Sequence, residues 1–134
     1  MNRLTGYITE IQSNEQISLV KVKAEDLIFT SIVLDTMETS DYLKIGNKCS
    51  IYFKETEVII SKDLTPDISI RNRIICFIKS IKHGQLLSQV NLKFANSEIS
   101  SIITTSACKE LNLQPDDHVL ALIKTNEVSL STND

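Results

Sequence analysis

Three short segments in the second half of the chain carry side chains that could bind a small anion. Residues 69–72, Ser-Ile-Arg-Asn, offer a hydroxyl, a guanidinium and an amide; Thr104-Thr105-Ser106 offers hydroxyls where a helix is expected to begin; Lys124-Thr125-Asn126 offers an ammonium group between two expected strands. Backbone N–H groups at a helix N-terminus attract anions, hydroxyls and amides add neutral donors, and a lysine supplies the countercharge. Together these donors fit a dianion.

Each segment also has an ordinary structural interpretation. Residues 69–72 can be the solvated beginning of a strand, residues 104–106 can simply cap a helix, and Lys124 can be a solvated hairpin lysine. Taken one at a time, the segments are better explained in this way. It is their combination that indicates an anion site.

Patterns that would indicate catalysis are missing from the sequence. It has no nucleophile elbow, no HExxH segment and no Walker loop, and it contains only three glycines. Its three cysteines, Cys49, Cys76 and Cys108, have no close spacing to one another or to the two histidines, which argues against a disulfide framework and a zinc site. We therefore expect a binding protein rather than an enzyme, with the cysteines as small buried residues.

Composition and charge narrow the class of partner. No apolar run approaches the roughly 18 residues of a membrane span, and the N-terminus lacks the apolar segment of a signal peptide, so we expect a soluble cytoplasmic protein without membrane contact. The net charge of −3 belongs to residues 1–64, which carry seven Lys/Arg against ten Asp/Glu, whereas residues 65–134 carry seven against seven. An anion should prefer the second half. An acidic chain with 5% aromatic residues is not expected to bind nucleic acid.

The segments that would form the site belong to an internal repeat. A shift of 70 residues, without a gap, aligns Asn2-Arg3 with Asn72-Arg73 and continues to Ser61 opposite Ser131. A fixed period of this kind usually marks a duplicated supersecondary unit. We expect repeat 1 over residues 1–64, a linker over residues 65–68 that contains Pro66, and repeat 2 over residues 69–134.

Each repeat has the pattern of five short strands and one short helix. Strand patterns cover residues 4–11, 17–22, 27–33, 49–53 and 57–61, and the equivalent residues 74–81, 87–92, 99–103, 119–123 and 127–131. Hydroxyl and carboxylate residues suited to N-caps predict one or two helical turns at residues 35–43 and 104–111. The predicted fold class is mainly β, with two tandem OB-like five-stranded β-barrel lobes, each with a short helix.

The three segments, taken together, resemble the signature of the Mop/TOBE family of molybdate-binding domains. The family pattern opens with Ser-Ala-Arg-Asn, continues with Val-Thr-x-x-Ser before Leu-Gly-Leu, and closes with Ile-Lys-Ala-Ser-x-Val. The corresponding residues here are 69–72, 103–113 and 121–128. The resemblance covers the whole second repeat and reaches the first through the internal register. The chain is therefore similar to the tandem di-Mop proteins, the molbindins, which store molybdate in the cytoplasm.

The resemblance implies a homotrimer of two-lobed subunits that holds molybdate or tungstate at subunit interfaces through hydroxyls, main-chain N–H groups and the lysine. Carried over by position, the residues that bind the oxyanion or adjoin it are Ser69, Arg71, Asn72, Thr104, Ser106, Lys124, Thr125 and Asn126 in the second repeat and Asn2, Lys54 and Thr56 in the first.

The chain departs from the family pattern at several positions. In the second repeat Ala107 replaces the serine of the central motif, although Ser106 is adjacent. In the first repeat Leu34 replaces the threonine and Met37 replaces the serine. We therefore expect some first-repeat sites to be weakened or lost.

Two functional hypotheses follow from the sequence. The first is non-enzymatic binding of molybdate or tungstate for cytoplasmic molybdenum storage or homeostasis. The alternative is a Mop-like module for oligomerisation or regulatory interaction in which ligand binding is reduced or lost, and the diverged first repeat motivates it. Molybdate and tungstate are tetrahedral dianions that would use the same donors, so the sequence does not distinguish them.

Overall fold

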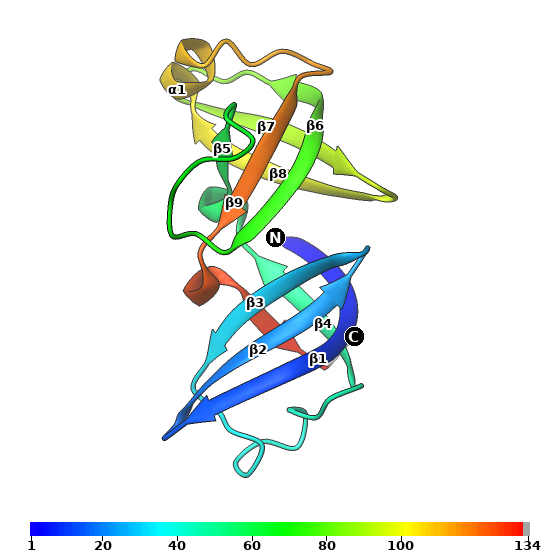
Figure 1. Cartoon of the computed structure of the whole chain (residues 1–134). Helices are drawn as coiled ribbons and strands as arrows, with labels where there is room; N and C mark the ends of the chain where they lie inside the picture. Colours follow the sequence, from blue (N-terminus) through cyan, green and yellow to red (C-terminus); the bar gives the residue numbers. More distant parts are fainter. Residues whose placement is uncertain (133–134) are drawn as a thin grey trace.

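The computed structural model describes residues 1–132, and in that part of the chain it contains ten strands, two 3-10 helices and one α-helix (Figure 1). The predicted mainly β fold class is confirmed. The first repeat comprises β1 (Asn2–Asn14), β2 (Ile17–Ala24), β3 (Leu27–Val33), β4 (Lys48–Phe53), the 3-10 helix η1 (Glu55–Glu57) and β5 (Ile59–Ser61). The second repeat comprises β6 (Asn72–Lys82), β7 (Leu87–Phe94), β8 (Ser97–Thr104), α1 (Thr105–Glu110), β9 (His118–Ile123), the 3-10 helix η2 (Thr125–Glu127) and β10 (Ser129–Ser131).

The last strand of each repeat joins the sheet of the other repeat. One sheet has the strand order β10-β4-β1-β2-β3 and the other has the order β5-β9-β6-β7-β8. β10 pairs with β4, and β5 pairs with β9, both antiparallel. We call the sheet that contains β1 the first lobe and the sheet that contains β6 the second lobe. Figure 1 shows the red β10 lying within the first lobe. Each lobe has five strands, but a lobe and a sequence repeat are not the same set of residues.

The prediction of OB-like five-stranded barrels is confirmed only in the number of strands, because within residues 1–132 neither sheet forms a complete ring of paired strands. β3 and β8 are edge strands, and the turn before the exchanged strand covers each edge. The Ser31 hydroxyl donates to the Val128 carbonyl at 2.5 Å, and the Ser101 hydroxyl donates to the Val58 carbonyl at 2.6 Å. The 3-10 helices interrupt the extended backbone at these places, so side-chain hydrogen bonds replace a strand ladder.

The α-helix predicted in both repeats forms only in the second. α1 begins after Thr104, whose hydroxyl accepts a hydrogen bond from the Ala107 N–H at 3.1 Å. It ends at Glu110 and is capped by Leu111; Asn112, the next residue, has a left-handed φ of 50°, and the Leu113 N–H then donates to the Cys108 carbonyl. These bonds satisfy groups that a helix end would otherwise leave without partners.

The first repeat lacks both of these caps, which explains why its helix prediction is wrong. Leu34 stands at the position of Thr104, and Tyr42 stands at the position of Asn112. A leucine side chain cannot accept a hydrogen bond at an N-cap, and a tyrosine does not favour left-handed backbone. Residues 34–47 accordingly form bends and turns.

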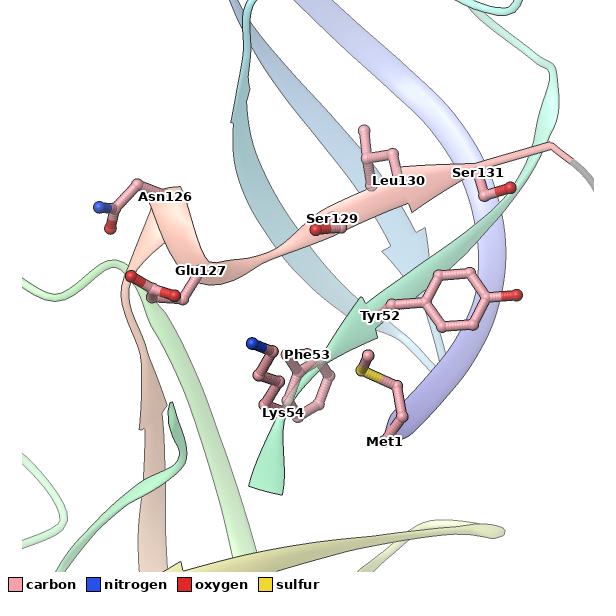
Figure 2. Close-up of a pocket in the computed structure, with 9 residues that line it drawn as sticks. All are labelled: Met1, Tyr52, Phe53, Lys54, Asn126, Glu127, Ser129, Leu130 and Ser131. Carbon is pink, nitrogen blue, oxygen red and sulfur yellow. The ribbon is translucent and has the colours of Figure 1, made fainter. Parts of the chain in front are cut away.

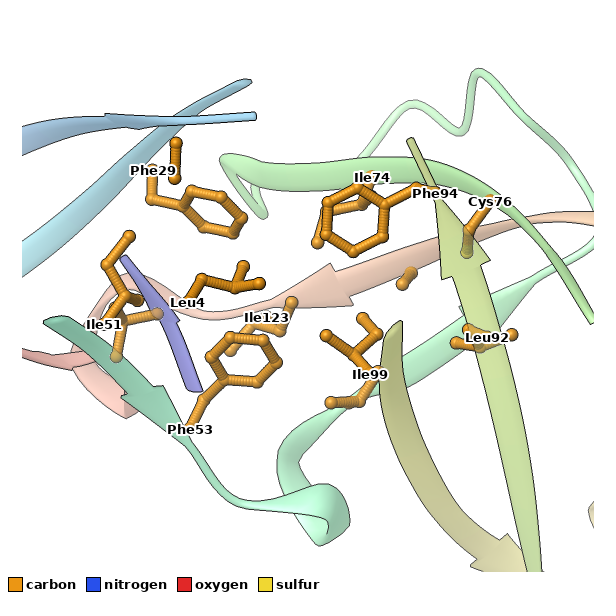
Figure 3. Close-up of a cluster of buried hydrophobic side chains, with 14 of the residues drawn as sticks. Leu4, Phe29, Ile51, Phe53, Ile74, Cys76, Leu92, Phe94, Ile99 and Ile123 are labelled. Atoms are coloured by element: carbon orange, nitrogen blue, oxygen red, sulfur yellow. The ribbon is translucent and has the colours of Figure 1, made fainter. Parts of the chain in front are cut away.

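One apolar core runs through both lobes. The rings of Phe29 and Phe53 lie with their centroids 6.4 Å apart in the first lobe. Figure 3 shows the cluster continuing from Phe53 through Ile123 to Ile99 and Leu92 of the second lobe. Lobes of this size bury little apolar surface alone, so we infer that each contributes to the stability of the other.

The three cysteines are free and buried, as predicted. Burial raises the pKa of the Cys76 thiol to about 12, so this thiol stays protonated at neutral pH. Within residues 1–132, no group of three or more His, Cys, Asp or Glu side chains could hold a metal ion. The same residues include no helix with the length and apolarity that crossing a membrane requires.

Candidate functional site

Two lysines that the sequence predicts as oxyanion ligands occupy equivalent positions between the lobes. Lys54 lies between β4 and η1, and Lys124 lies between β9 and η2. Both are exposed, and neither side chain caps its 3-10 helix, because an ammonium group cannot accept a hydrogen bond. We call residues 54–58 and 124–128, where the chain crosses from one lobe to the other, the waist. The waist therefore carries two exposed ammonium groups.

Lys124 and Arg71 lie just beyond the ends of two paired strands. The β6–β9 ladder ends at the pair Asn72–Ile123, and Arg71 and Lys124 are the residues next to that last pair in the sequence. The β5–β9 ladder ends at the pair Ile59–Leu122, two residues after Glu57, the last residue of η1. The salt bridges formed within residues 1–132 include neither Arg71 nor Lys124. Two exposed cations thus adjoin the end of the same strand pair.

Lys54 lies in a pocket of about 460 Å³ that both repeats line. The wall from the first repeat belongs to the end of β4 and the N-terminus, and the wall from the second repeat belongs to η2 and β10 (Figure 2). The lining residues are Met1, Tyr52, Phe53, Lys54, Asn126, Glu127, Ser129, Leu130 and Ser131.

Carboxylates offset the positive charge around Lys54. Figure 2 shows the Lys54 ammonium group directed toward the turn that carries Glu127. The amino group of Met1 forms a salt bridge of 2.6 Å with Glu55, and this hydrogen bond lowers the pKa of the Glu55 carboxyl, which therefore stays ionised at neutral pH. Around Lys54, the Met1 amino group offsets the Glu55 carboxylate, and Glu127 offsets the lysine itself, so little positive charge is left for a dianion. Beside Lys124, the residue equivalent to Glu55 is the neutral Thr125.

The two predicted asparagines bind main chain of the opposite lobe. The Asn72 side-chain amide donates to the Thr30 carbonyl at 2.8 Å, and its oxygen accepts from the Thr30 N–H at 2.7 Å. Asn2 forms the same two bonds with Ser100, both at 2.8 Å. Asn2 and Asn72 are buried, and each side chain satisfies the edge of β8 or β3 as a neighbouring strand would. In this structure they join the lobes.

The linker before Arg71 is wrapped around Arg73, a residue that the sequence did not single out. The Arg73 guanidinium donates to the carbonyls of Pro66, Ile68 and Ile70 at 2.9, 2.7 and 2.9 Å. These three bonds fix the backbone up to the residue before Arg71. Ser69 lies in the same segment and is exposed. The sequence offered one signal for a role of Arg73, its alignment with Arg3 in the internal repeat, and that alignment does not predict a contact with the linker.

The hydroxyls at the start of α1 lie away from the waist. Thr104 and Ser106 are exposed, and α1 lies at the far end of the second lobe from η2 (Figure 1). The neighbouring Thr105, whose hydroxyl belongs to the same candidate segment, is buried, donates to the Gly84 carbonyl at 2.8 Å and lies 2.9 Å from the Ser88 hydroxyl. One chain therefore does not bring Thr104 and Ser106 together with Lys124.

The other predicted residues lie on the turns of the waist. Thr56 is exposed on η1, Asn126 is exposed on η2, and Thr125 is half-buried beside it. The waist thus carries both lysines and these three polar side chains, which are neutral hydrogen-bond donors, and Arg71 lies outside it, next to the end of the β6–β9 ladder. Such a set of groups can bind a small anion.

Known proteins share this domain type and this fold. Residues 68–130 match the TOBE domain family, so the resemblance of the second repeat to that family is confirmed. The whole chain is similar to a crystal structure of the cytoplasmic molybdate-binding protein ModG with molybdate bound. The TM-score is 0.91, the sequence identity is 24%, and the match covers 97% of this chain and 94% of that one. A search of curated proteins finds no match. The fold of the chain is therefore that of ModG.

Proposed function

We propose that this protein binds molybdate or tungstate as an intact oxyanion, without reaction chemistry, and serves cytoplasmic molybdenum storage or homeostasis. The observation that carries the proposal is that two exposed cations, Arg71 and Lys124, adjoin the last pair of the β6–β9 ladder. Two cations balance the charge of a tetrahedral dianion, and their N–H groups donate to its oxygens. The TOBE match and the fold shared with ModG, which binds molybdate, support the same ligand.

The neutral groups near these two cations fit this ligand. Thr56 and Thr125 carry hydroxyls on the turns of the waist, and Ser69 lies two residues before Arg71. A fully ionised oxyanion accepts hydrogen bonds from each of these donors. Molybdate and tungstate have the same shape and charge, so the donors serve both.

A homotrimer with the oxyanion at its subunit interfaces is part of the proposal. Thr104 and Ser106 lie at one end of the second lobe and Lys124 at the other, so a site that uses all three needs a second subunit. The surface offers apolar side chains for such contacts, because several large ones are mostly exposed: Met1, Tyr7, Leu34, Met37, Ile45, Ile75, Leu86 and Leu87.

Isothermal titration calorimetry tests the proposed ligand. The protein, in a buffer without phosphate, is titrated with molybdate, tungstate and sulfate at micromolar protein concentration. We expect saturable heat with molybdate or tungstate. Heat no larger than that of sulfate would contradict the proposal. Native mass spectrometry with added molybdate then counts subunits and bound anions in one measurement.

The alternative function is a Mop-like module for oligomerisation or regulatory interaction, with reduced or lost ligand binding. The carboxylates of Glu55, Glu57 and Glu127 at the waist favour it, because they oppose an anion. A trimer whose thermal stability is the same with and without molybdate would support this alternative. Nucleic acid is not proposed as a partner, since the net charge of −3 repels phosphates.

A further inference from the structure

We infer that Arg73 is a positioning residue for the proposed oxyanion site: it holds residues 66–71, which we call the strap, and thereby fixes where Arg71 meets the anion. The inference rests on the proposed function. It concerns a residue that follows the segment equivalent to the family's Ser-Ala-Arg-Asn and is not part of it. Arg73 does not bind the anion itself, because its guanidinium is occupied by main-chain carbonyls.

One guanidinium holds the strap at three points. Its Nη1, Nη2 and Nε groups each donate to a different carbonyl, those of Pro66, Ile68 and Ile70, at 2.9, 2.7 and 2.9 Å. A guanidinium presents its N–H groups in a rigid planar fork, whereas the ammonium group of a lysine has all its donors on one nitrogen. Because carbonyls of every second residue converge on one side chain, the strap curves around Arg73.

The backbone of Arg71 is held at both of its neighbours. The Ile70 carbonyl, which Arg73 binds, belongs to the peptide group that joins Ile70 to Arg71. On the other side, Asn72 begins β6, and its side chain binds the main chain of Thr30. The Arg71 side chain is nevertheless exposed and available to a ligand. Donors that are fixed before binding lose less conformational entropy when the ligand arrives, so this arrangement strengthens binding.

The strap lies on the outer face of the sheet. Leu120 and Leu122 alternate along β9 with residues of the apolar core, so they point to the other face, and each is only 1% exposed. Arg73 is opposite Leu122 in the β6–β9 ladder and therefore shares that face. Figure 1 shows the green strap passing beside β9. Since the strap is outside the core, its effect on binding can be separated from an effect on folding.

The equivalent arginine of the first repeat has different contacts. Arg3, which a shift of 70 residues relates to Arg73, donates to the Ser50 hydroxyl at 3.1 Å and lies over the Tyr52 ring, 5.8 Å from its centroid. These partners belong to β4 and not to a segment that carries predicted anion ligands. Arg3→Lys is therefore a matched control for Arg73→Lys, with the same chemical change at the same position of the other repeat.

Molybdate titration of the full-length protein tests the inference. The variants are Arg73→Lys, Arg71→Ala and their combination, with Arg3→Lys as the control, and urea unfolding checks that each variant folds. We expect Arg73→Lys to weaken binding about tenfold, which corresponds to a strap that is closed in about a tenth of the molecules. Arg3→Lys should change binding less than about twofold. Arg73→Lys keeps the positive charge, so the loss reports on geometry; unchanged affinity in this variant would overturn the inference.

The double variant shows whether Arg73 acts through Arg71. If it does, the combination of Arg71→Ala and Arg73→Lys binds about as weakly as Arg71→Ala alone, because a strap without the Arg71 side chain has little left to position. Losses that multiply would mean that the two arginines contribute independently, and would overturn the inference. A general loosening of the fold would not produce this dependence of one variant on the other.

Limited proteolysis of the unmodified protein adds a test that needs no variant to fold. Coupling between a ligand and a conformation is reciprocal, so an anion bound by Arg71 must favour the closed strap. We expect saturating molybdate, but not sulfate, to slow cleavage within residues 62–71, and we expect Arg73→Lys to speed it without ligand. If the protein binds molybdate and this cleavage does not slow, only the inference fails. If the unmodified protein binds no molybdate, the proposed function fails and the role of Arg73 in binding fails with it.

Discussion

Asn72 illustrates how a single side chain can take the place of a strand. Its amide N–H donates to the Thr30 carbonyl while its oxygen accepts from the Thr30 N–H, and Asn2 treats Ser100 in the same way. Only a side chain with one donor and one acceptor at this spacing satisfies both groups. The match of Asn2 and Asn72 between the repeats thus has a structural explanation that does not involve a ligand.

Asn72→Asp should therefore destabilise the protein at neutral pH. The carboxylate can still accept from the Thr30 N–H, but it repels the Thr30 carbonyl, and we expect a loss of about 3 kcal/mol in the free energy of unfolding. Urea unfolding measures it, with the exposed Asn126→Asp as the control.

The pH dependence of the same variant provides a second test. Burial and the facing carbonyl raise the pKa of the new carboxyl in the folded state above its unfolded value of about 4. Protonation restores a donor, so the stability deficit relative to the unmodified protein should shrink as the pH falls through the folded-state pKa. A deficit independent of pH between 7 and about 4 would contradict the proposed geometry.

Lys124 and Lys54 should differ in their effect on molybdate binding. Lys124 and Arg71 adjoin the last pair of the β6–β9 ladder, whereas Lys54 lines a pocket with Glu127 and is followed in the chain by Glu55. We expect Lys124→Ala to weaken binding roughly tenfold to a hundredfold, which corresponds to the loss of hydrogen bonds to a charged ligand. Lys54→Ala should have a much smaller effect. Titration calorimetry at one ionic strength compares them, and equal losses would show that the charges around the two lysines do not decide affinity.

At the scale of elements, the sequence predicted the strands and could not assign the last one to its sheet. The alternation of apolar and polar residues is a local signal, and it located all five strands of each repeat. Ile59-Ile60-Ser61 and Ser129-Leu130-Ser131 have similar patterns, and β4 and β9 offer equivalent edges. The choice between the two equivalent partners depends on the path of the chain through the waist. The alternation of apolar and polar residues carries no information about that path.

The absence of a helix in the first repeat, unlike the strand exchange, could have been predicted, because the sequence shows that the cap residues are missing. The general preference for hydroxyl and carboxylate residues predicted a helix at residues 35–43, yet Leu34 and Tyr42 occupy its two cap positions.

The candidate site was predicted in the same partial way. Residue types identified the cations of the waist, while the burial of Asn2 and Asn72 and the contacts of Arg73 depend on packing between lobes.

Asn112 should be sensitive to the shape of its replacement. Its φ of 50° is accessible to asparagine and glycine but strained for a β-branched residue. We expect Asn112→Val to lower the free energy of unfolding by about 1–2 kcal/mol and Asn112→Gly to leave it within about 0.5 kcal/mol. Thermal or urea unfolding measures both. Equal losses for the two variants would mean that a side-chain contact, and not the backbone conformation, matters there.

At the scale of the whole molecule, the exchange of β5 and β10 makes each repeat a structural part of the other lobe. The pairs β5–β9 and β10–β4, the bonds of Asn2 and Asn72, and the continuous core all cross between repeats. The bonds of Arg73 to the linker do not cross in this way, because Arg73 and the carbonyls that it binds lie between residues 66 and 73. The linker peptide itself is therefore not what keeps the two repeats together.

A chain cut within the linker should accordingly remain assembled. A protease recognition sequence is inserted between Leu64 and Thr65, which are exposed, and the purified protein is cleaved. We expect the two fragments to co-elute on size-exclusion chromatography and to unfold in one transition. Separation of the fragments without denaturant would contradict the exchange, and an inserted but uncleaved protein is the control.

The exchanged strands also constrain how such a chain can be recombined. The first lobe draws on residues near both termini, and the second lobe includes residues 59–61 as well as β6 to β9. No single crossover point in the gene separates one lobe from the other. A hybrid that takes one whole repeat from a related gene would receive a last strand and a 3-10 helix shaped for a different neighbour. We therefore expect substitutions in β4 and β10 to depend on each other although these strands lie in different halves of the gene, because the two strands are paired.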